Sequence, residues 1–202
     1  MLPEGFVYVK DVIPAIREDI RYAGSHNFVG CPIDGYAAPR AVLRREAALA
    51  LKQAADAFAR QGYGLLIYDA FRPQRAVDHF VRWAQDPADQ KMKAEFYPTL
   101  DKAELFPRGY IAVRSGHSRG LTVDLTLTDA SGAPVDMGGE FDWFAKISAH
   151  DYPDLTPAQK QNRLLLKSGM EAAGFEPYCE EWWHYTLPGG PQVRDFYDFP
   201  IE

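Results

Sequence analysis

Apolar and polar residues follow two different periods along the chain. Helical spacing of apolar side chains, as at Leu43, Ala47, Leu51 and Phe58, recurs in three segments: residues 40–61, 74–86 and 156–174. Short apolar, alternating or aromatic-rich runs typical of strands occupy four others: residues 65–68, 110–114, 121–128 and 180–187. Because these helices and strands are mixed without regular strand–helix–strand units, the pattern predicts the α+β class.

Turn-forming residues mark the ends of these elements. Gly62 follows the first helix as a C-terminal cap, and Thr156-Pro157 opens the last helix in the N-cap and N1 positions. The turn at residues 129–132 follows a predicted strand, so Pro134 is expected to begin the returning strand of a hairpin.

The N-terminal part differs from the rest of the chain. Residues 1–39 carry glycines and prolines among aromatic residues, which predicts a long irregular arm that packs on the body and contributes to a pocket. No internal repeat or low-complexity segment divides the sequence. We therefore expect a single domain over residues 1–202.

Composition and charge exclude several classes of protein. The chain has 202 residues, of which 25% are charged, and a net charge of −6. There is no basic stripe of the kind that binds nucleic acid, and no run of about 20 apolar residues that would span a membrane. Cys31 and Cys179 are far apart and read as unpaired thiols in a reducing compartment. Since residues 1–6 do not resemble a secretory signal, the sequence predicts a cytoplasmic protein.

Two of the five histidines stand in unusual surroundings. His117 lies in a turn of small residues that leads into the strand carrying Asp124, and His184 follows Glu-Glu-Trp-Trp. A catalytic zinc site needs three nitrogen or oxygen ligands and one open position for water. The spacing from His117 to Asp124 is common in unrelated proteins, so it indicates a metal site only in combination with the segment around His184.

Several motifs in one order give this combination its meaning. Residues 115–124 resemble the Ser-x-His-x-x-Gly-x-Ala-x-Asp motif of the D-alanyl-D-alanine dipeptidases of the vancomycin-resistance type, and residues 181–184 match that family's Glu-x-x-His motif. Residues 69–73 are similar to its Asp-x-[Tyr/Phe]-Arg-Pro segment. Further likeness lies in the arm and the middle loop, at residues 27–30, 34–36 and 137–142. The resemblance implies the DD-peptidase/hedgehog-like fold, with a central antiparallel sheet flanked by helices.

The same resemblance assigns roles to individual residues. It implies one zinc ion (Zn2+) per chain, with His117, Asp124 and His184 as metal ligands. Glu181 is then the general base for zinc-bound water, and Arg72 stabilises the oxyanion.

Four other residues are implied to bind the substrate. Asp142 is similar to the carboxylate that receives the free ammonium group of a dipeptide. Tyr22, Tyr36 and Ser115 resemble the groups that close around it.

Strand periodicity and the motif disagree about the base. In a regular strand Glu180 and His184 share one face and Glu181 points to the other, so alternation alone favours Glu180. A bulge or turn is needed to bring Glu181 over the metal. The resemblance selects Glu181.

The function implied is hydrolysis of the dipeptide D-alanyl-D-alanine to D-alanine, which could serve antibiotic resistance or nutrient recycling of cell-wall material. One alternative is a DD- or LD-carboxypeptidase on longer wall peptides, against which Asp142 argues. Another is a zinc-bearing binding domain without catalysis, against which Arg72 and Glu181 argue. Thr122 and Cys31 depart from the family pattern and leave the fine dipeptide preference open. No pattern indicates an oligomeric state.

Overall fold

Short strands and helices alternate irregularly along the chain. The computed structural model describes residues 2–189 and 195–202. In chain order the elements are β1 (Phe6–Tyr8), α1 (Val9–Val12), β2 (Arg17–Glu18), η1 (Arg21–Ala23), β3 (Val42–Arg44), α2 (Arg45–Ala59), β4 (Gly64–Asp69), α3 (Gln74–Ala84), α4 (Lys93–Phe96), α5 (Lys102–Leu105), η2 (Gly116–Arg119), β5 (Thr122–Thr128), η3 (Lys146–Ser148), α6 (Pro157–Ala172), β6 (Glu176–Pro177) and β7 (His184–Thr186).

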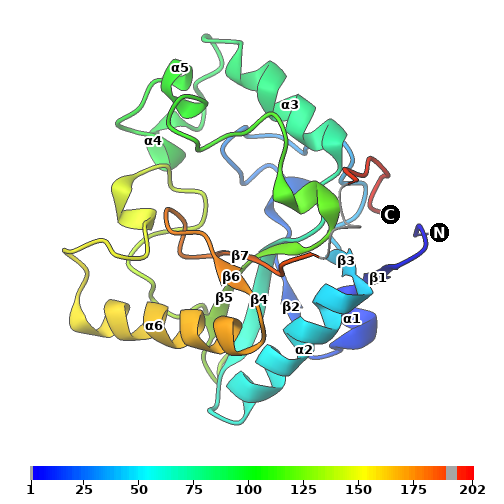
Figure 1. Ribbon diagram of the computed structural model, residues 1–202. Coiled ribbons are helices and arrows are strands. Elements are labelled where there is room, and N and C mark those ends of the chain that lie inside the picture. The colour runs from blue at the N-terminus through cyan, green and yellow to red at the C-terminus, as the bar shows by residue number, and fades with distance from the viewer. Residues whose placement is uncertain (1, 190–194) are drawn as a thin grey trace.

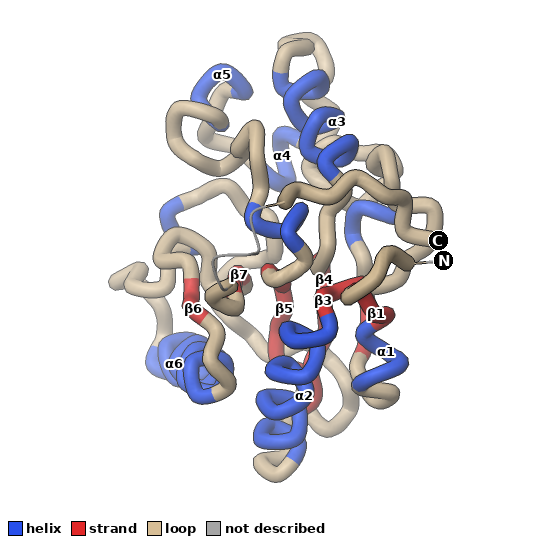
Figure 2. The backbone as a smooth tube through the Cα atoms, turned by 45° about the vertical axis from the view of Figure 1, so that its right-hand side comes forward, coloured by secondary structure: helices blue, strands red, loops and turns tan. Residues whose placement is uncertain are grey.

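A sheet in the middle of the molecule separates two groups of helices. In Figure 1, α2 and α6 lie below this sheet, and α3, α4 and α5 lie above it. Figure 2 shows that the helices of the upper group are joined to the sheet and to one another by long loops. The predicted α+β class is confirmed, and the loop-rich side is where the candidate site forms.

The central sheet is largely antiparallel. Its strand order is β2-β4-β5-β7-β6, and β1 pairs with β3 in a separate two-stranded sheet. β4, β5, β7 and β6 pair antiparallel, as predicted, whereas β2 runs parallel to β4. The parallel edge comes from the N-terminal arm.

Strand β5 has one apolar and one polar face. Val123, Leu125 and Leu127 alternate with Asp124 and Thr126, and all of them are buried. Since successive side chains of a strand point to opposite faces, the aliphatic set and Asp124 lie on different sides of the sheet. Helix α2, which lies within the predicted helical segment 40–61, packs against β4 and α6.

The contact between α2 and α6 depends on a glycine. A Cβ atom on Gly169 of α6 would lie 2.2 Å from the ring of Phe58, which is fully buried in α2. A side chain at this position would therefore push the two helices apart. The close approach fills the core beneath the sheet.

Helix α6 begins with reciprocal hydrogen bonds. The Thr156 Oγ1 atom accepts from the Gln159 backbone N–H at 3.2 Å, and the Gln159 side chain accepts from the Thr156 N–H at 3.0 Å. We expect Thr156→Ala to lower the free energy of unfolding by about 1 kcal/mol, because one backbone donor loses its partner. Urea denaturation would measure this. Ser168→Ala, in the exposed middle of the same helix, is the control and should cause no loss; equal losses in both variants would contradict the role of the cap.

The N-terminal segments differ in two ways from the sequence prediction. The first long helix begins at Arg45 and not at residue 40, because Val42–Arg44 form β3 and pair with β1. Residues 1–39 are not irregular throughout, since β1, α1, β2 and η1 lie within them. The arm is thus partly incorporated into both sheets.

Three predicted strands are absent or shorter in the described structure. Residues 110–114 form no strand: Ile111 is buried, the Tyr110 ring stacks on Phe144 with centroids 5.2 Å apart, and Val113 is exposed. The predicted strand 180–187 reduces to β7, with a turn before it. The strand after β5 reduces to one bridge from Thr128 to Pro134.

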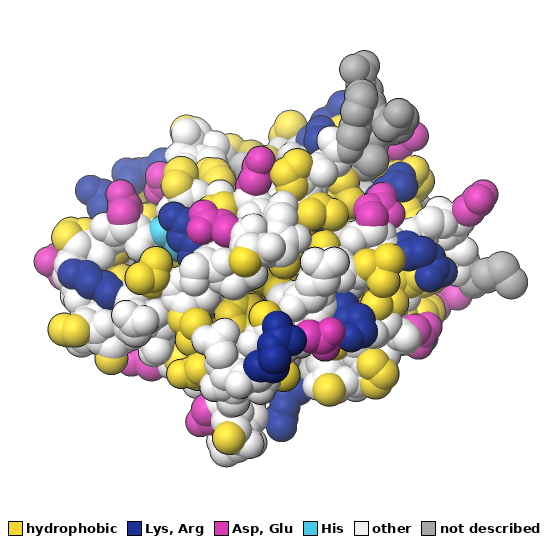
Figure 3. All heavy atoms as spheres, turned by 60° about the horizontal axis from the view of Figure 1, so that its bottom comes forward, with side chains coloured by type: hydrophobic (Ala, Val, Ile, Leu, Met, Phe, Trp, Pro, Cys, Tyr) yellow, Lys and Arg dark blue, Asp and Glu magenta, His cyan; other side chains and the backbone are white. Residues whose placement is uncertain are grey.

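The surface and the cysteines agree with the composition. On the face shown in Figure 3, positive and negative side chains are interspersed among small apolar areas. Both cysteines are free: Cys31 is half-buried and Cys179 is exposed. No helix in residues 2–189 and 195–202 is both long and apolar enough to cross a membrane.

Candidate active site

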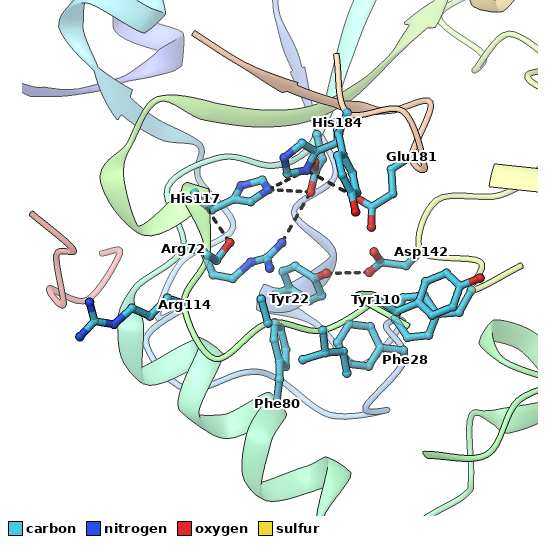
Figure 4. Close-up of a pocket in the computed structure, with 18 residues that line it drawn as sticks. Tyr22, Phe28, Arg72, Phe80, Tyr110, Arg114, His117, Asp142, Glu181 and His184 are labelled. Carbon is cyan, nitrogen blue, oxygen red and sulfur yellow. Dashed lines mark hydrogen bonds and ion pairs between the residues drawn. The ribbon is translucent and has the colours of Figure 1, made fainter. Parts of the chain in front are cut away.

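A cavity of about 230 Å³ lies between the sheet and α3 (Figure 4). Its walls come from the arm, from the turn after β4, from α3, and from the loops before β5, after β5 and before β7. Aromatic and aliphatic side chains form part of the wall, and charged groups gather at one side. The residues that line it are Tyr22, Phe28, Arg72, Phe80, Gly109, Tyr110, Ile111, Ala112, Arg114, Ser115, Gly116, His117, Asp124, Asp142, Phe144, Tyr178, Glu181 and His184.

Three of these residues could hold a metal ion. One possible donor atom from each of His117, Asp124 and His184 lies within 4.8 Å of the other two, and no other such group of three occurs in the described part of the chain. Asp124 and His184 are register partners on β5 and β7. His117 lies in η2, which Ser115 caps by accepting from the His117 N–H at 3.3 Å. Local hydrogen bonding and strand pairing therefore fix all three.

The arrangement of lone pairs fits a cation. His117 Nδ1 lies 2.6 Å from the Ala70 carbonyl oxygen, which can only accept, so this nitrogen carries the proton and Nε2 offers its lone pair. His117 Nε2 lies 3.4 Å from His184 Nδ1 and 3.2 Å from Asp124 Oδ2. Asp124 Oδ1 is buried without a hydrogen bond, although His184 Nδ1 is 3.0 Å away. Three ligand atoms that converge, with a buried carboxylate oxygen left without a hydrogen bond among them, are what a shared metal ion requires.

The donor set also fits a catalytic metal. Two imidazoles and one carboxylate are three ligands of the types that zinc takes, and they leave a fourth position open to the cavity. Burial opposes ionisation of Asp124, but His117 and His184 outweigh it and lower the pKa of this carboxyl. The Thr122 hydroxyl, which departs from the family motif, pairs with Thr186 at 3.0 Å on the neighbouring strand.

Glu181 lies beside this cluster because the chain turns before β7. The Glu181 N–H donates to the Tyr178 carbonyl, and the His184 N–H donates to the Glu181 carbonyl. The turn removes the strand alternation that favoured Glu180, whose side chain is exposed. Glu181 Oε2 is 3.5 Å from His184 Nδ1. Burial raises the pKa of the Glu181 carboxyl to about 7.

Arg72 brings a fixed positive charge to the cavity. Its Nε donates to Asp69 Oδ2 at 2.9 Å, and its Nη2 lies 3.6 Å from Asp124 Oδ2. The guanidinium also sits over the rings of Tyr22 and Phe80, at 5.0 and 5.4 Å from their centroids. These contacts hold the cation at the edge of the histidine–aspartate cluster, as Figure 4 shows.

Asp142 and Tyr22 form a second polar group in the cavity. The Tyr22 hydroxyl donates to Asp142 Oδ2 at 2.7 Å, and Asp142 is buried. Burial raises the pKa of the Asp142 carboxyl well above its usual range. Among the described residues, Asp142 is the one non-glycine residue whose backbone φ is positive, at 60°. Such strain gathers at functional sites.

The loop that carries Asp142 is held from below by α6. Arg163 is 3% exposed and donates to the carbonyl oxygens of Met137, Ile147 and Ala149 at 2.6, 2.8 and 2.6 Å. One guanidinium thus joins both ends of the loop to the helix. These hydrogen bonds from Arg163 explain how Asp142 keeps its strained backbone conformation.

Most of the residues predicted from the sequence meet in this cavity. Tyr36 does not: it is buried, it does not line the cavity, and its hydroxyl donates to Asp69 Oδ1 at 2.6 Å.

The sequence had assigned no role to Asp69 or to the aromatic side chains of the cavity wall. The Asp-x-Phe-Arg-Pro segment contains Asp69, so its place in that motif was an available signal. The aromatic lining was not assigned from the sequence: Phe28, Phe80, Tyr110, Phe144 and Tyr178.

Comparison with known sequences gives extensive matches. The D-ala-D-ala dipeptidase family matches residues 3–202. The chain is 48% identical over 197 residues to the D-alanyl-D-alanine dipeptidase of Streptomyces coelicolor, covering 97% of this chain and 98% of that protein. It is 41% identical over 199 residues to that of Enterococcus faecium, covering 98% of each. With the Escherichia coli protein of the same name it shares 34% identity over 177 residues, covering 88% of this chain and 81% of that protein.

Solved structures show more distant likenesses. A vancomycin-resistance D,D-pentapeptidase, VanY, in complex with Zn(II) gives a TM-score of 0.44 at 14% identity, covering 78% of each chain. The LD-carboxypeptidase LdcB gives a TM-score of 0.44 at 19% identity, covering 96% of this chain and 72% of that one. At these scores the likeness supports no conclusion about this chain.

Proposed function

The chain belongs to the D-alanyl-D-alanine dipeptidase family, and from this premise we propose that it hydrolyses D-alanyl-D-alanine to D-alanine with the aid of bound zinc. The observation that carries the proposal is the convergence of His117, Asp124 and His184 within 4.8 Å at the wall of a small cavity. These three residues would hold the ion. Bound zinc supplies a Lewis acid that lowers the pKa of water and polarises a carbonyl.

Glu181 is proposed as the general base. It accepts a proton from the attacking water and delivers it to the leaving amine. Its place 3.5 Å from His184 Nδ1 supports this role, because a carboxylate beside the metal ligands lies within reach of a water molecule at the open ligand position.

Arg72 is proposed to stabilise the oxyanion that forms on the scissile carbonyl. A cation held in place before the reaction needs no reorganisation when negative charge develops. The hydrogen bond from Nε to Asp69 and the ring contacts with Tyr22 and Phe80 support such a fixed position.

Asp142, Tyr22 and Ser115 are proposed to bind the dipeptide. The buried Asp142 carboxylate would receive the free ammonium group, whose charge compensates the cost of burying the acid. Tyr22 orients that carboxylate, and Ser115 borders the cavity next to His117. A volume of about 230 Å³ supports a substrate of two small residues over a longer peptide.

A panel of dipeptides with zinc analysis tests the proposal. The purified chain should bind zinc, cleave D-alanyl-D-alanine faster than its L,D, D,L and N-acetylated counterparts, lose activity with a chelator and regain it with zinc. Zinc binding without cleavage of any dipeptide or wall peptide would support the non-catalytic binding domain instead.

The Asp142→Asn variant separates a dipeptidase from a carboxypeptidase. Without the carboxylate, KM for the dipeptide should rise at least about 30-fold, since an ammonium would then be buried without its partner. Steady-state kinetics on the dipeptide and on a wall pentapeptide measure the difference. Glu140→Gln, on the exposed part of the same loop, is the matched control. Pentapeptide cleavage that exceeds dipeptide cleavage and is unaffected by Asp142→Asn would favour the carboxypeptidase.

The wider setting stays a prediction from the sequence. We propose a single domain over residues 1–202, a cytoplasmic location, and no nucleic acid or membrane partner. Limited proteolysis and cell fractionation test the first two of these. Sedimentation would establish the oligomeric state, to which no feature of the sequence points.

A further inference from the structure

Tyr36 is a buried tyrosine directly behind the cavity wall. It is 6% exposed, and its ring centroid lies 5.7 Å from that of Tyr22, which does line the cavity. The backbone around it is fixed by the C-terminal segment: the Ile201 N–H donates to the Gly35 carbonyl at 2.8 Å, and the Ala37 N–H donates to the Ile201 carbonyl at 2.9 Å. The hydroxyl therefore has one fixed direction.

That direction leads to Asp69. Asp69 is fully buried, and its two oxygens accept from different donors: Oδ1 from the Tyr36 hydroxyl at 2.6 Å and Oδ2 from Arg72 Nε at 2.9 Å. His117 Nδ1 lies 3.5 Å from the same Oδ2. Burial and the Asp69 carboxylate raise the pKa of the Tyr36 hydroxyl well above its usual range, so this group stays protonated and donates.

An irregularity of the sheet places Asp69 at this point. The register between β4 and β5 shifts between Ile67 and Asp69, so that Ile67 faces Leu125 and Asp69 faces Asp124. Such bulges redirect side chains, and they occur beside active sites. Here the shift brings Asp69 to the same position along the strands as a candidate metal ligand.

We propose that Tyr36 is a positioning residue for the oxyanion-stabilising cation: its hydroxyl orients Asp69, and Asp69 orients the Arg72 guanidinium in the cavity. The inference rests on the proposed function for the role of Arg72. This positioning role replaces the direct contact with substrate that the family resemblance implied for Tyr36. Loss of the hydroxyl leaves a buried carboxylate oxygen without its donor, and Asp69 must rotate or take up water to recover a partner.

Tyr36→Phe tests the kinetic consequence. The ring and its packing remain, so we expect Arg72 to shift by less than about 1 Å. Since a misplacement of about 1 Å can cost about 100-fold, kcat should fall roughly tenfold. KM should change less than twofold, because Tyr36 does not border the cavity. In an Arg72→Lys background the same substitution should have no further effect. A tenfold rise in KM with unchanged kcat, or an equal effect in both backgrounds, would overturn the proposal.

The matched control is Tyr97→Phe. The Tyr97 hydroxyl is buried and has no hydrogen-bond partner among the described residues, and Tyr97 does not line the cavity. Removing it should leave kcat and KM within twofold of the unmodified protein. Equal losses of kcat in the two variants would assign the effect of Tyr36→Phe to a general disturbance of packing and refute the positioning role.

A second measurement does not depend on dipeptidase activity. The Nε–H signal of Arg72 in an NMR spectrum can be assigned by its loss in Arg72→Lys. Tyr36→Phe should speed the exchange of this proton with solvent about tenfold, and Tyr97→Phe should leave it unchanged. An unchanged exchange rate of the Arg72 proton in Tyr36→Phe overturns the coupling even if the proposed function holds. Faster exchange in a protein that cleaves no dipeptide supports the coupling and refutes the function.

Discussion

Glu181→Gln is expected to lower kcat for D-alanyl-D-alanine by about 10³-fold, within the range that a general base contributes. Glutamine has the same size as glutamate, so it fits the turn between Tyr178 and His184, but its amide cannot accept the proton of the attacking water. Because Glu181 lies outside the proposed ligand set, zinc should remain bound at one ion per chain. Single-turnover kinetics together with metal analysis would measure both quantities.

The neighbouring acid is the control for this experiment. Glu180 is exposed and does not line the cavity, so Glu180→Gln should keep activity within twofold. If Glu180→Gln were inactive and Glu181→Gln active, Glu180 would be the general base, as strand alternation alone predicts. Loss of zinc in Glu181→Gln would instead place this residue among the metal ligands.

Arg72→Lys is expected to lower kcat by about 10²-fold or more, with zinc content unchanged. Lysine keeps the charge but has no planar fork, so it cannot donate to Asp69 and face the cavity in the same geometry. The expected loss is therefore one of position and not of charge. Steady-state kinetics should show it in kcat more than in KM, because the oxyanion exists only in the transition state.

Arg75→Lys is the matched control for Arg72→Lys. Arg75 lies three positions further along the chain and pairs with Asp198 on the surface, where its side chain is 45% exposed. Its replacement should change kcat less than twofold, since surface ion pairs contribute little. If both variants lose activity equally, the structural integrity of this turn and not the Arg72 cation would explain the loss.

The sequence was most informative where local pattern and tertiary structure agree. Strand β5 was predicted from its alternation, and it is buried on both faces, with Asp124 opposite the aliphatic side chains. The helix α6 began where Thr156 and Pro157 predicted. Such signals are readable because they depend on neighbours in the chain.

Other features depended on partners that are distant in the sequence. Strand β2 consists of Arg17 and Glu18, a pair without any apolar signal, and it exists because β4 pairs with it. Residues 110–114 are apolar enough for a strand, yet only Tyr110 and Ile111 pack inward at the cavity, and Val113 is exposed. No local pattern distinguishes these outcomes.

The turn before β7 shows the same limit within the site. The aromatic sequence around Trp182 and Trp183 favoured an extended segment, but the Trp182 N–H donates to the Ser148 carbonyl and the Trp183 carbonyl accepts from the Leu125 N–H. These long-range bonds hold the turn that brings Glu181 to the metal cluster. Tyr36 was likewise placed in the cavity by motif alone, because its hydroxyl direction depends on the pairing of Gly35 and Ala37 with Ile201.

Arg163 has a consequence for how tightly a small substrate can bind. Its guanidinium holds the carbonyls of Met137, Ile147 and Ala149, and so fixes the loop that presents Asp142 before any ligand arrives. The entropy cost of ordering this loop is therefore met during folding and not during binding, which leaves more of the contact energy for affinity. A dipeptide offers few contacts, and a preorganised receptor is the means by which so small a molecule can still be bound selectively.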